Sequence, residues 1–152
     1  MAEPIQPSAA GTSQWGPLAS WGDRVIAALV DWVPILLLNA VGTRLGAIGT
    51  LVSLIGTAYG FYIRYMEGER GATPGKRLTG LKVVKDADGQ TIGGGMGIVR
   101  NIAHFVDAII CFIGFLFPLW DPKRQTIADK LVGTVVLRDQ PKEALSAEIF
   151  KI

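Results

Sequence analysis

A stretch of nineteen residues without a charge, LGAIGTLVSLIGTAYGFYI, occupies residues 45–63. An α-helix needs about 20 consecutive apolar residues to cross a bilayer, so this stretch is long enough to span a membrane. Two further apolar stretches, each with one acidic residue, occupy residues 25–41 and 102–120. The chain is therefore predicted to be an all-α membrane protein: a transmembrane two-helix hairpin plus a third apolar helical segment.

The first two stretches are separated by GTR at residues 42–44, which predicts a tight antiparallel pair of helices. Pro34 is expected to kink the first of them. Small side chains recur at helical spacing on the second helix, at Gly49, Ser53, Gly56 and Gly60. In lipid such a stripe lets two helix backbones approach closely, so we expect it to pack against the first helix. The alternative is that it faces a helix of another protein.

The composition agrees with a membrane location, since 49% of the residues are hydrophobic and 18% are charged, against roughly 25% charged residues in soluble domains. The length suits one domain. We expect a flexible N-terminal tail at residues 1–20, a membrane domain at residues 21–138 and a C-terminal tail at residues 139–152. The single cysteine, Cys111, excludes an internal disulfide and is expected to be buried.

Basic residues predict which side of the membrane each connection faces. The loop at residues 64–101 contains seven lysines and arginines, whereas the GTR connection contains Arg44 alone. Because cytoplasmic loops are enriched in basic residues, this loop and the N-terminus are expected to be cytoplasmic.

The third apolar stretch has two interpretations. Its nineteen residues suit one crossing, but a crossing would place six later basic residues outside. Two strand-like runs favour a small cytoplasmic β element: LKVV at residues 81–84, continued by the turn and strand KDADGQTI, and GTVVLR at residues 133–138. If these runs pair, the third stretch must enter the membrane and return, breaking near Gly114 and Pro118, and the C-terminus is cytoplasmic. Both the spanning and the re-entrant interpretation stay open.

No motif indicates catalysis or a bound cofactor. GATPGK at residues 71–76 has three residues between its glycines where a phosphate-binding P-loop has four, and Arg77 replaces the required Ser or Thr. GGGMG at residues 93–97 lacks the spacing of a dinucleotide-binding loop. We therefore expect neither an enzyme nor a cofactor or metal.

Two similar segments place charges at the edge and in the interior of apolar sequence. RVIAALVD at residues 24–31 and RNIAHFVD at residues 100–107 agree at five of eight positions. Each puts an arginine and an aspartate seven residues apart, near one face of a helix, and His104 shares that face. Packed side by side, the segments would bring Asp31 and Asp107 to a similar depth. Two carboxylates there need a shared proton or cation.

This charge site has two interpretations. In the first, Asp31 and Asp107 form a proton- or sodium-handling pair, with Arg24 and Arg100 as counter-charges and His104 as an auxiliary donor. In the second, Arg24 extends to the lipid headgroups, and each aspartate makes a structural polar contact between helices.

Four segments together resemble a known family: DRVIAALVDW at residues 23–32, GATPGKRLTGLKVV at 71–84, IVRNIAHFVDAI at 98–109 and KRQTIADKLVGTVVL at 123–137. They resemble the RDD family of bacterial membrane proteins, named for one arginine and two aspartates. By this resemblance Arg24 and Asp31 are the first two signature residues, and the second aspartate is Asp107 or Asp129.

The resemblance implies a multi-pass protein of the bacterial plasma membrane. Transport is suggested for the family, and some members are similar to sodium–proton antiporters. Three helical segments are few for a transporter acting alone, so proton, sodium or small-ligand transport implies a homo-oligomer. The alternative is an accessory or assembly subunit of a larger membrane complex. Expected partners are the bilayer, anionic lipid headgroups near TPGKRLTGLK, and copies of the chain or such a complex, but no nucleic acid.

Overall fold

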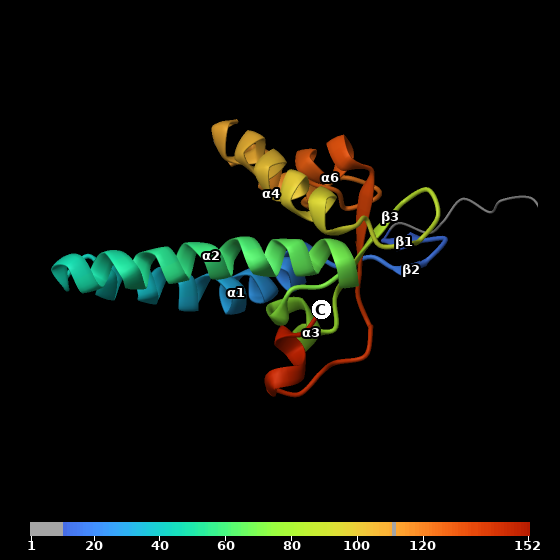
Figure 1. Ribbon diagram of the computed structural model, residues 1–152. Coiled ribbons are helices and arrows are strands. Elements are labelled where there is room, and N and C mark those ends of the chain that lie inside the picture. The colour runs from blue at the N-terminus through green and yellow to red at the C-terminus, as the bar shows by residue number, and fades with distance from the viewer. Residues whose placement is uncertain (1–10, 111) are drawn as a thin grey trace, which may run out of the picture.

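The computed structural model describes residues 11–110 and 112–152. Its main feature is a pair of long antiparallel helices, α1 (Trp21–Gly42) and α2 (Gly46–Arg70), which extend away from the rest of the molecule (Figure 1). Within the described residues, these two helices are long and apolar enough to cross a membrane. The predicted hairpin of a multi-pass membrane protein is confirmed. Cys111 and residues 1–10 of the predicted tail lie outside the described residues.

Local signals set the ends of the two helices. Ser20 and Asp23 form a capping box at the start of α1. Gly71, in the left-handed conformation, ends α2. Pro34 lies inside α1, which continues through it.

The small-residue stripe of α2 packs against α1 inside the chain. A Cβ atom added to Gly49 would lie 1.7 Å from the carbonyl oxygen of Gly42, and one added to Gly56 would lie 3.2 Å from Asn39 Nδ2. At Gly60 the nearest atom, Ile35 Cδ1, is 3.6 Å away. The two backbones are therefore closest near the turn that joins the helices.

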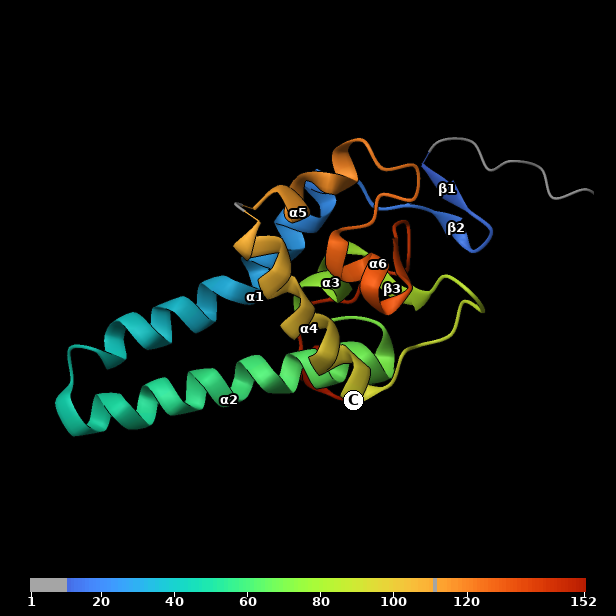
Figure 2. The same cartoon turned by 90° about the horizontal axis from the view of Figure 1, so that it is seen from above.

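The third apolar stretch is bent rather than straight. It begins within α4 (Gly94–Ile109) and continues after a bend of 106° into α5 (Ile113–Leu116) and the 3₁₀ helix η1 (Phe117–Leu119). Figure 2 shows α5 returning toward the first turns of α1. There the indole nitrogen of Trp21 donates a hydrogen bond of 3.0 Å to the carbonyl oxygen of Phe115.

Two short strands, one before and one after this bent segment in the sequence, pair with each other. β3 (Lys82–Lys85) pairs antiparallel with β4 (Thr134–Leu137), as the β-branched runs predict. The predicted second strand in KDADGQTI is wrong, because after the turn at residues 86–89 the chain leads into α4. β4 is buried at all four positions and provides β3 with a more apolar partner.

Apolar clusters surround this strand pair. One contains Ala19, Ala27, Leu81, Val83 and Val136, and the other contains Leu18, Val84, Val135 and Leu137. Before them, β1 (Thr12–Ser13) and β2 (Gly16–Pro17) form a small hairpin. Within the range expected to form the N-terminal tail, the described residues 11–20 thus contribute Leu18 and Ala19 to the core.

Two short helices and the C-terminal residues complete the assembly. These are α3 (Pro74–Thr79), α6 (Ile127–Val132) and the 3₁₀ helix η2 (Ala147–Phe150). Arg77 donates hydrogen bonds to the carbonyl oxygens of Glu148 and Ile149, and Ile149 is fully buried. We call residues 33–62 the arm and the other described residues the base.

Candidate functional site

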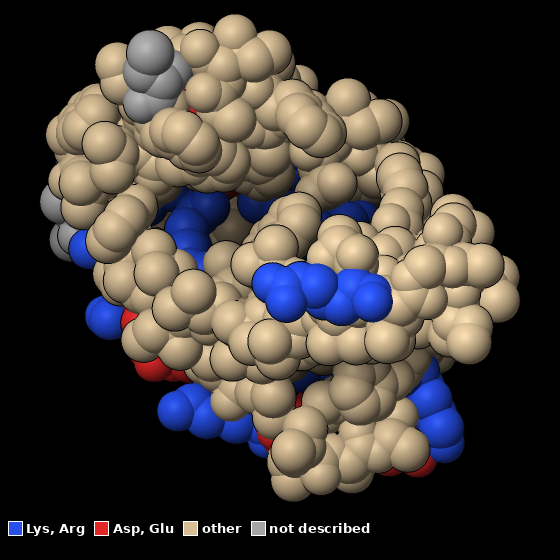
Figure 3. All heavy atoms as spheres, turned by 90° about the vertical axis from the view of Figure 1, so that its left-hand side faces the viewer, with Lys and Arg blue, Asp and Glu red and all other residues tan. Residues whose placement is uncertain are grey.

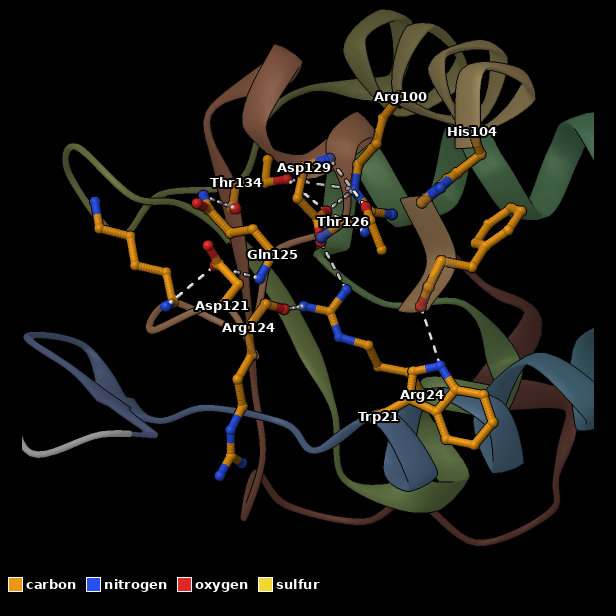
Figure 4. Close-up of polar contacts among 12 residues, drawn as sticks. Trp21, Arg24, Arg100, His104, Asp121, Arg124, Gln125, Thr126, Asp129 and Thr134 are labelled. Atoms are coloured by element: carbon orange, nitrogen blue, oxygen red, sulfur yellow. Dashed lines mark hydrogen bonds and ion pairs between the residues drawn. The ribbon is translucent and has the colours of Figure 1, made fainter. Parts of the chain in front are cut away.

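A buried carboxylate joins three helices of the base. Asp129, on α6, is fully buried. Its Oδ2 lies 2.6 Å from Arg24 Nη1 on α1, and its Oδ1 lies 2.6 Å from Arg100 Nη2 on α4. Figure 4 shows both guanidinium groups pointing at this one side chain. The hydroxyl of Thr134 donates a further hydrogen bond of 3.0 Å to Oδ1.

The same aspartate also begins its own helix, because Thr126 and Asp129 form a capping box at the start of α6. Burial by itself raises the pKa of a carboxyl group. Arg100 and Arg24 outweigh this effect and hold the pKa of Asp129 well below its usual range. Asp129 is therefore negatively charged at neutral pH, and its ion pairs fix α1, α4 and α6 relative to one another.

The ion-pair network continues toward α3. Arg100 Nη1 lies 3.2 Å from Glu67 Oε2, and Lys76 forms an ion pair with the other oxygen of Glu67. Burial lowers the pKa of Lys76, and Glu67 opposes that shift. Positive and negative side chains thus alternate from Arg24 to Lys76.

The two aspartates of the repeated segments do not meet. Asp31 Oδ1 accepts a hydrogen bond of 2.8 Å from the backbone N–H of Gly75, at the start of α3. Asp107 Oδ1 accepts one of 3.0 Å from the N–H of Ile127, at the start of α6, and its Oδ2 lies 2.7 Å from His104 Nδ1. Each aspartate therefore holds the N-terminus of a different short helix.

Arg24 and Arg100 were expected to act as counter-charges to Asp31 and Asp107. Among the residues that the structure describes, neither arginine forms an ion pair with either aspartate, since both bind Asp129. The expected pairing is therefore corrected. Spacing along one helix places an arginine and an aspartate on one face, but here that face contacts short helices that offer backbone N–H groups and a third carboxylate.

These contacts reveal a second pair of similar segments, which was not predicted from the sequence. Thr73 and Thr126 are the N-caps of α3 and α6, and Gly80 and Gly133 end these helices in the left-handed conformation. A strand follows each helix, and Val83 pairs with Val136 at corresponding positions. The signal in the sequence is a threonine, a leucine, a glycine and a valine at the same spacing: Thr73, Leu78, Gly80, Val83 and Thr126, Leu131, Gly133, Val136.

The base therefore contains two halves with similar segments, and these halves are joined by the β3–β4 pair. One half combines α1, α3 and β3, and the other combines α4, α6 and β4. The residue that corresponds to Ile127 is Pro74, which has no N–H, so Asp31 binds the next one, on Gly75. The halves differ in charge where Lys76 corresponds to Asp129, and this explains why Arg24 binds across to the other half.

A cavity of about 280 Å³ lies between the two halves. Within the described residues, its lining has four cationic side chains, those of Arg24, Arg64, Lys76 and Arg100, and one carboxylate, that of Asp31. Trp21, Trp32, His104 and Phe115 form other parts of the wall. Figure 3 shows lysine and arginine side chains inside a hollow that opens beside the arm. Asp107 and Asp129 lie behind this wall and do not line the cavity.

Arg64 differs from the other three cations. It is 9% exposed, and its guanidinium carbon lies 5.4 Å from the centre of the Trp32 ring. Across residues 11–110 and 112–152, its side chain makes no hydrogen bond and no ion pair. In the sequence, Arg64 directly follows the uncharged stretch, so it was predicted to belong to the basic loop.

Comparison with known proteins shows which family and which relatives the sequence matches. Residues 18–133 match the model of the RDD family. The proline-rich antigen homolog of Mycobacterium tuberculosis is 41% identical over 146 residues, which cover 76% of this chain and 61% of that protein. The proline-rich antigen of Mycobacterium leprae is 40% identical over 148 residues, which cover 77% of this chain and 59% of that protein.

The chain thus spans about three fifths of the length of these curated relatives. No solved structure matches the chain.

Proposed function

The chain belongs to the RDD family, and from this premise we propose that it is a transport protein that binds a small anionic ligand in the cavity between its two halves. The observation that carries the proposal is the charge of the described cavity wall, where four cations accompany one carboxylate. The sodium or proton site predicted from the sequence needs Asp31 and Asp107 to face one another. Asp31 and Asp107 instead each hold a helix terminus. The geometry therefore favours an anion over sodium or a proton.

The position of the cavity supports the same proposal. In transporters built from repeated units, the ligand site lies where the repeats meet. Here Arg24 and Asp31 come from one half, and Arg100 and His104 come from the other. A movement of one half against the other would change the width of the cavity, which is what a carrier requires.

We propose that the base faces the cytoplasm and that the third apolar segment is re-entrant. The pairing of β3 with β4 supports this, because it holds both ends of the bent segment together. The basic residues of the 64–101 loop support the cytoplasmic side. We propose the bacterial plasma membrane as the location, and membership of the RDD family supports this.

We propose further that the protein acts as a homo-oligomer and not as an enzyme. The arm exposes large apolar side chains on both helices, such as Leu36 at 60% and Leu51 at 62%, and these surfaces are available to a second copy or to lipid. The accessory-subunit alternative assigned the small-residue stripe to a partner. Because Gly49 and Gly56 pack on α1, that role would need another surface.

Thermal unfolding of the full chain in an uncharged detergent tests the choice between anion and cation. We expect phosphate, sulfate or citrate to raise the unfolding temperature, whichever cation accompanies it, and the effect to be lost in Arg64→Gln. Arg44→Gln, the same change at the exposed turn of the arm, serves as the matched control. If sodium salts stabilise more than choline salts of the same anion, and Asp31→Asn removes that difference, the proposal is wrong and the cation-transport interpretation is favoured.

A further inference from the structure

Among the described residues that line the cavity, Arg64 is the cation whose side chain has no hydrogen-bond or ion-pair partner. Arg64 is nine-tenths buried, and within the described parts of the chain no carboxylate or carbonyl oxygen accepts a hydrogen bond from it. The other cations of the cavity have ion-pair partners: Asp129 binds Arg24 and Arg100, and Glu67 binds Lys76. The guanidinium nitrogens of Arg64 are not among the fully enclosed side-chain atoms that lack a partner, so they are accessible from the cavity. Arg64 is therefore the cation of this wall whose N–H groups are available to an external anion.

The chemistry of arginine narrows the class of that anion. A guanidinium is planar and presents paired N–H groups that bind two oxygens of one phosphate or carboxylate. Arg64 also stacks near Trp32, which limits its movement. Lys76 and Arg24 lie in the same cavity wall, so the site has further positive charge for a group with several oxygens.

The walls of the cavity indicate how the anion arrives. Trp21 and Trp32 line it and are 36% and 44% exposed. Amphipathic rings of this kind concentrate at the boundary between lipid tails and headgroups. In Figure 3 the tip of the arm faces the viewer, and the hollow is open toward that side, which is the side from which the arm extends into lipid. The exposed apolar surface of α1 continues from Trp32 through Val33 to Leu36.

From these observations we propose that the cavity binds the phosphate group of an anionic membrane lipid, with Arg64 as the phosphate-binding residue. This inference rests on the anion-binding function proposed above and names the ligand class. The headgroup enters sideways from the membrane, and its acyl chains lie against the apolar face of α1. Basic pockets between membrane helices on the cytoplasmic side are suited to such headgroups. Free inorganic phosphate has the same charge chemistry but no apolar part for this face.

The test measures lipid bound to the intact chain in an uncharged detergent by native mass spectrometry. Dioleoyl phosphatidylglycerol, dioleoyl phosphatidylcholine and inorganic phosphate are each titrated. We expect phosphatidylglycerol to bind more tightly than the other two. Arg64→Gln should weaken its binding by at least about tenfold, as the loss of a charge-assisted contact predicts. Arg44→Gln should leave it unchanged.

A second variant keeps the test decisive if Arg64→Gln fails to fold. Ala28 lines the cavity, and its side chain lies on the exposed side of α1. Ala28→Phe narrows the entrance without changing any charge, and we expect it to weaken phosphatidylglycerol binding while binding of inorganic phosphate persists.

Other outcomes separate this inference from the proposed function. If inorganic phosphate binds as tightly as phosphatidylglycerol and Ala28→Phe has no effect on the lipid, the lipid inference is overturned while the anion site stands. If Arg44→Gln weakens lipid binding as much as Arg64→Gln, the contact is general surface attraction and the inference fails. If neither lipid nor phosphate responds to Arg64, both the inference and the proposed function are wrong.

Discussion

The arm and the base place their charged and apolar side chains in opposite ways. In the arm, Leu36 and Leu37 are each 60% exposed, and glycines occupy the helix contact. In the base, Asp129 is fully buried and Arg100 is 4% exposed. The contrast shows how one chain adapts to two surroundings. Because lipid accepts apolar side chains on the outside, the arm leaves most of its large apolar side chains exposed.

The two regions are consequently stabilised by different forces. Between helices in lipid the hydrophobic effect contributes little, and close backbone contact provides the attraction. In the base, ion pairs are held out of water, where each partner depends on the other. Changes in the arm should therefore act through steric fit, and changes in the base through lost charge partners.

The largest effect is expected when the base loses its central carboxylate. Asp129→Asn leaves Arg24 without its ion-pair partner and weakens the contacts of Arg100, so unfolding should become easier by about 3–5 kcal/mol. Thermal unfolding in detergent measures this change. Asp139→Asn, at an exposed ion pair with Arg138, is the control and should have little effect. Equal unfolding temperatures for the two variants would show that the buried network does not hold the base together.

Acidification should act on the same network. Because the pKa of Asp129 is lowered in the folded state, its contribution to stability is present above the unfolded-state pKa of about 3.9 and is lost as the pH falls further. We expect the stability that Asp129 contributes, measured as the difference between the parent chain and Asp129→Asn, to be constant between neutral pH and about pH 5 and to decline below about pH 4. Unfolding temperatures of both chains across this range check the prediction, and a difference between them that grows on acidification would contradict it.

In the arm, a smaller effect should follow one added methyl group. Gly49→Ala would place a Cβ atom against the backbone of Gly42, and such overpacking costs about 1–3 kcal/mol. Gly60→Ala is the matched control, because its added atom would meet Ile35 at an ordinary distance of 3.6 Å. Thermal unfolding of both variants in detergent gives the comparison. A stripe that contributes nothing to the hairpin would tolerate both changes alike.

The smallest effect is expected at an exposed ion pair of the base. The Lys123 side chain is 59% exposed and pairs with Asp86. Water and salt screen such pairs, so Lys123→Gln should change stability by less than about 0.5 kcal/mol. A loss of several times that size, seen by the same unfolding measurement, would mean that the base depends on surface charges as well as on buried ones.

The arm could be predicted from sequence because its signals are local. The uncharged stretch at residues 45–63 and the short GTR connection determine the helix pair. The pairing of β3 with β4 was also foreseen, because an isolated apolar strand such as GTVVLR needs a partner. The predicted second strand in KDADGQTI is not formed. The run after the turn is short and polar, and β3 pairs instead with β4, which is buried at all four positions.

The candidate site was harder to predict because its contacts join distant parts of the chain. Asp129 meets Arg24 only after α6 has been placed beside α1, and no spacing rule connects them. The repeat that relates Thr73 to Thr126 was present in the sequence, but few of its positions are identical. Arg64 looked like the first residue of a loop, and its burial depends on α4 and Trp32.

The central claim is that α1 and α2 cross the membrane while both ends of the bent third segment lie on one side of it. Single cysteines at Asp88, Arg138 and Arg44 in a Cys111→Ser background test it with a membrane-impermeant maleimide, applied to intact cells and to inverted membrane vesicles. Our account predicts that Asp88→Cys and Arg138→Cys react only in inverted vesicles and Arg44→Cys only in intact cells. Reaction of Arg138→Cys in intact cells, with Asp88→Cys protected there, would contradict it, because the third apolar segment would then cross the membrane.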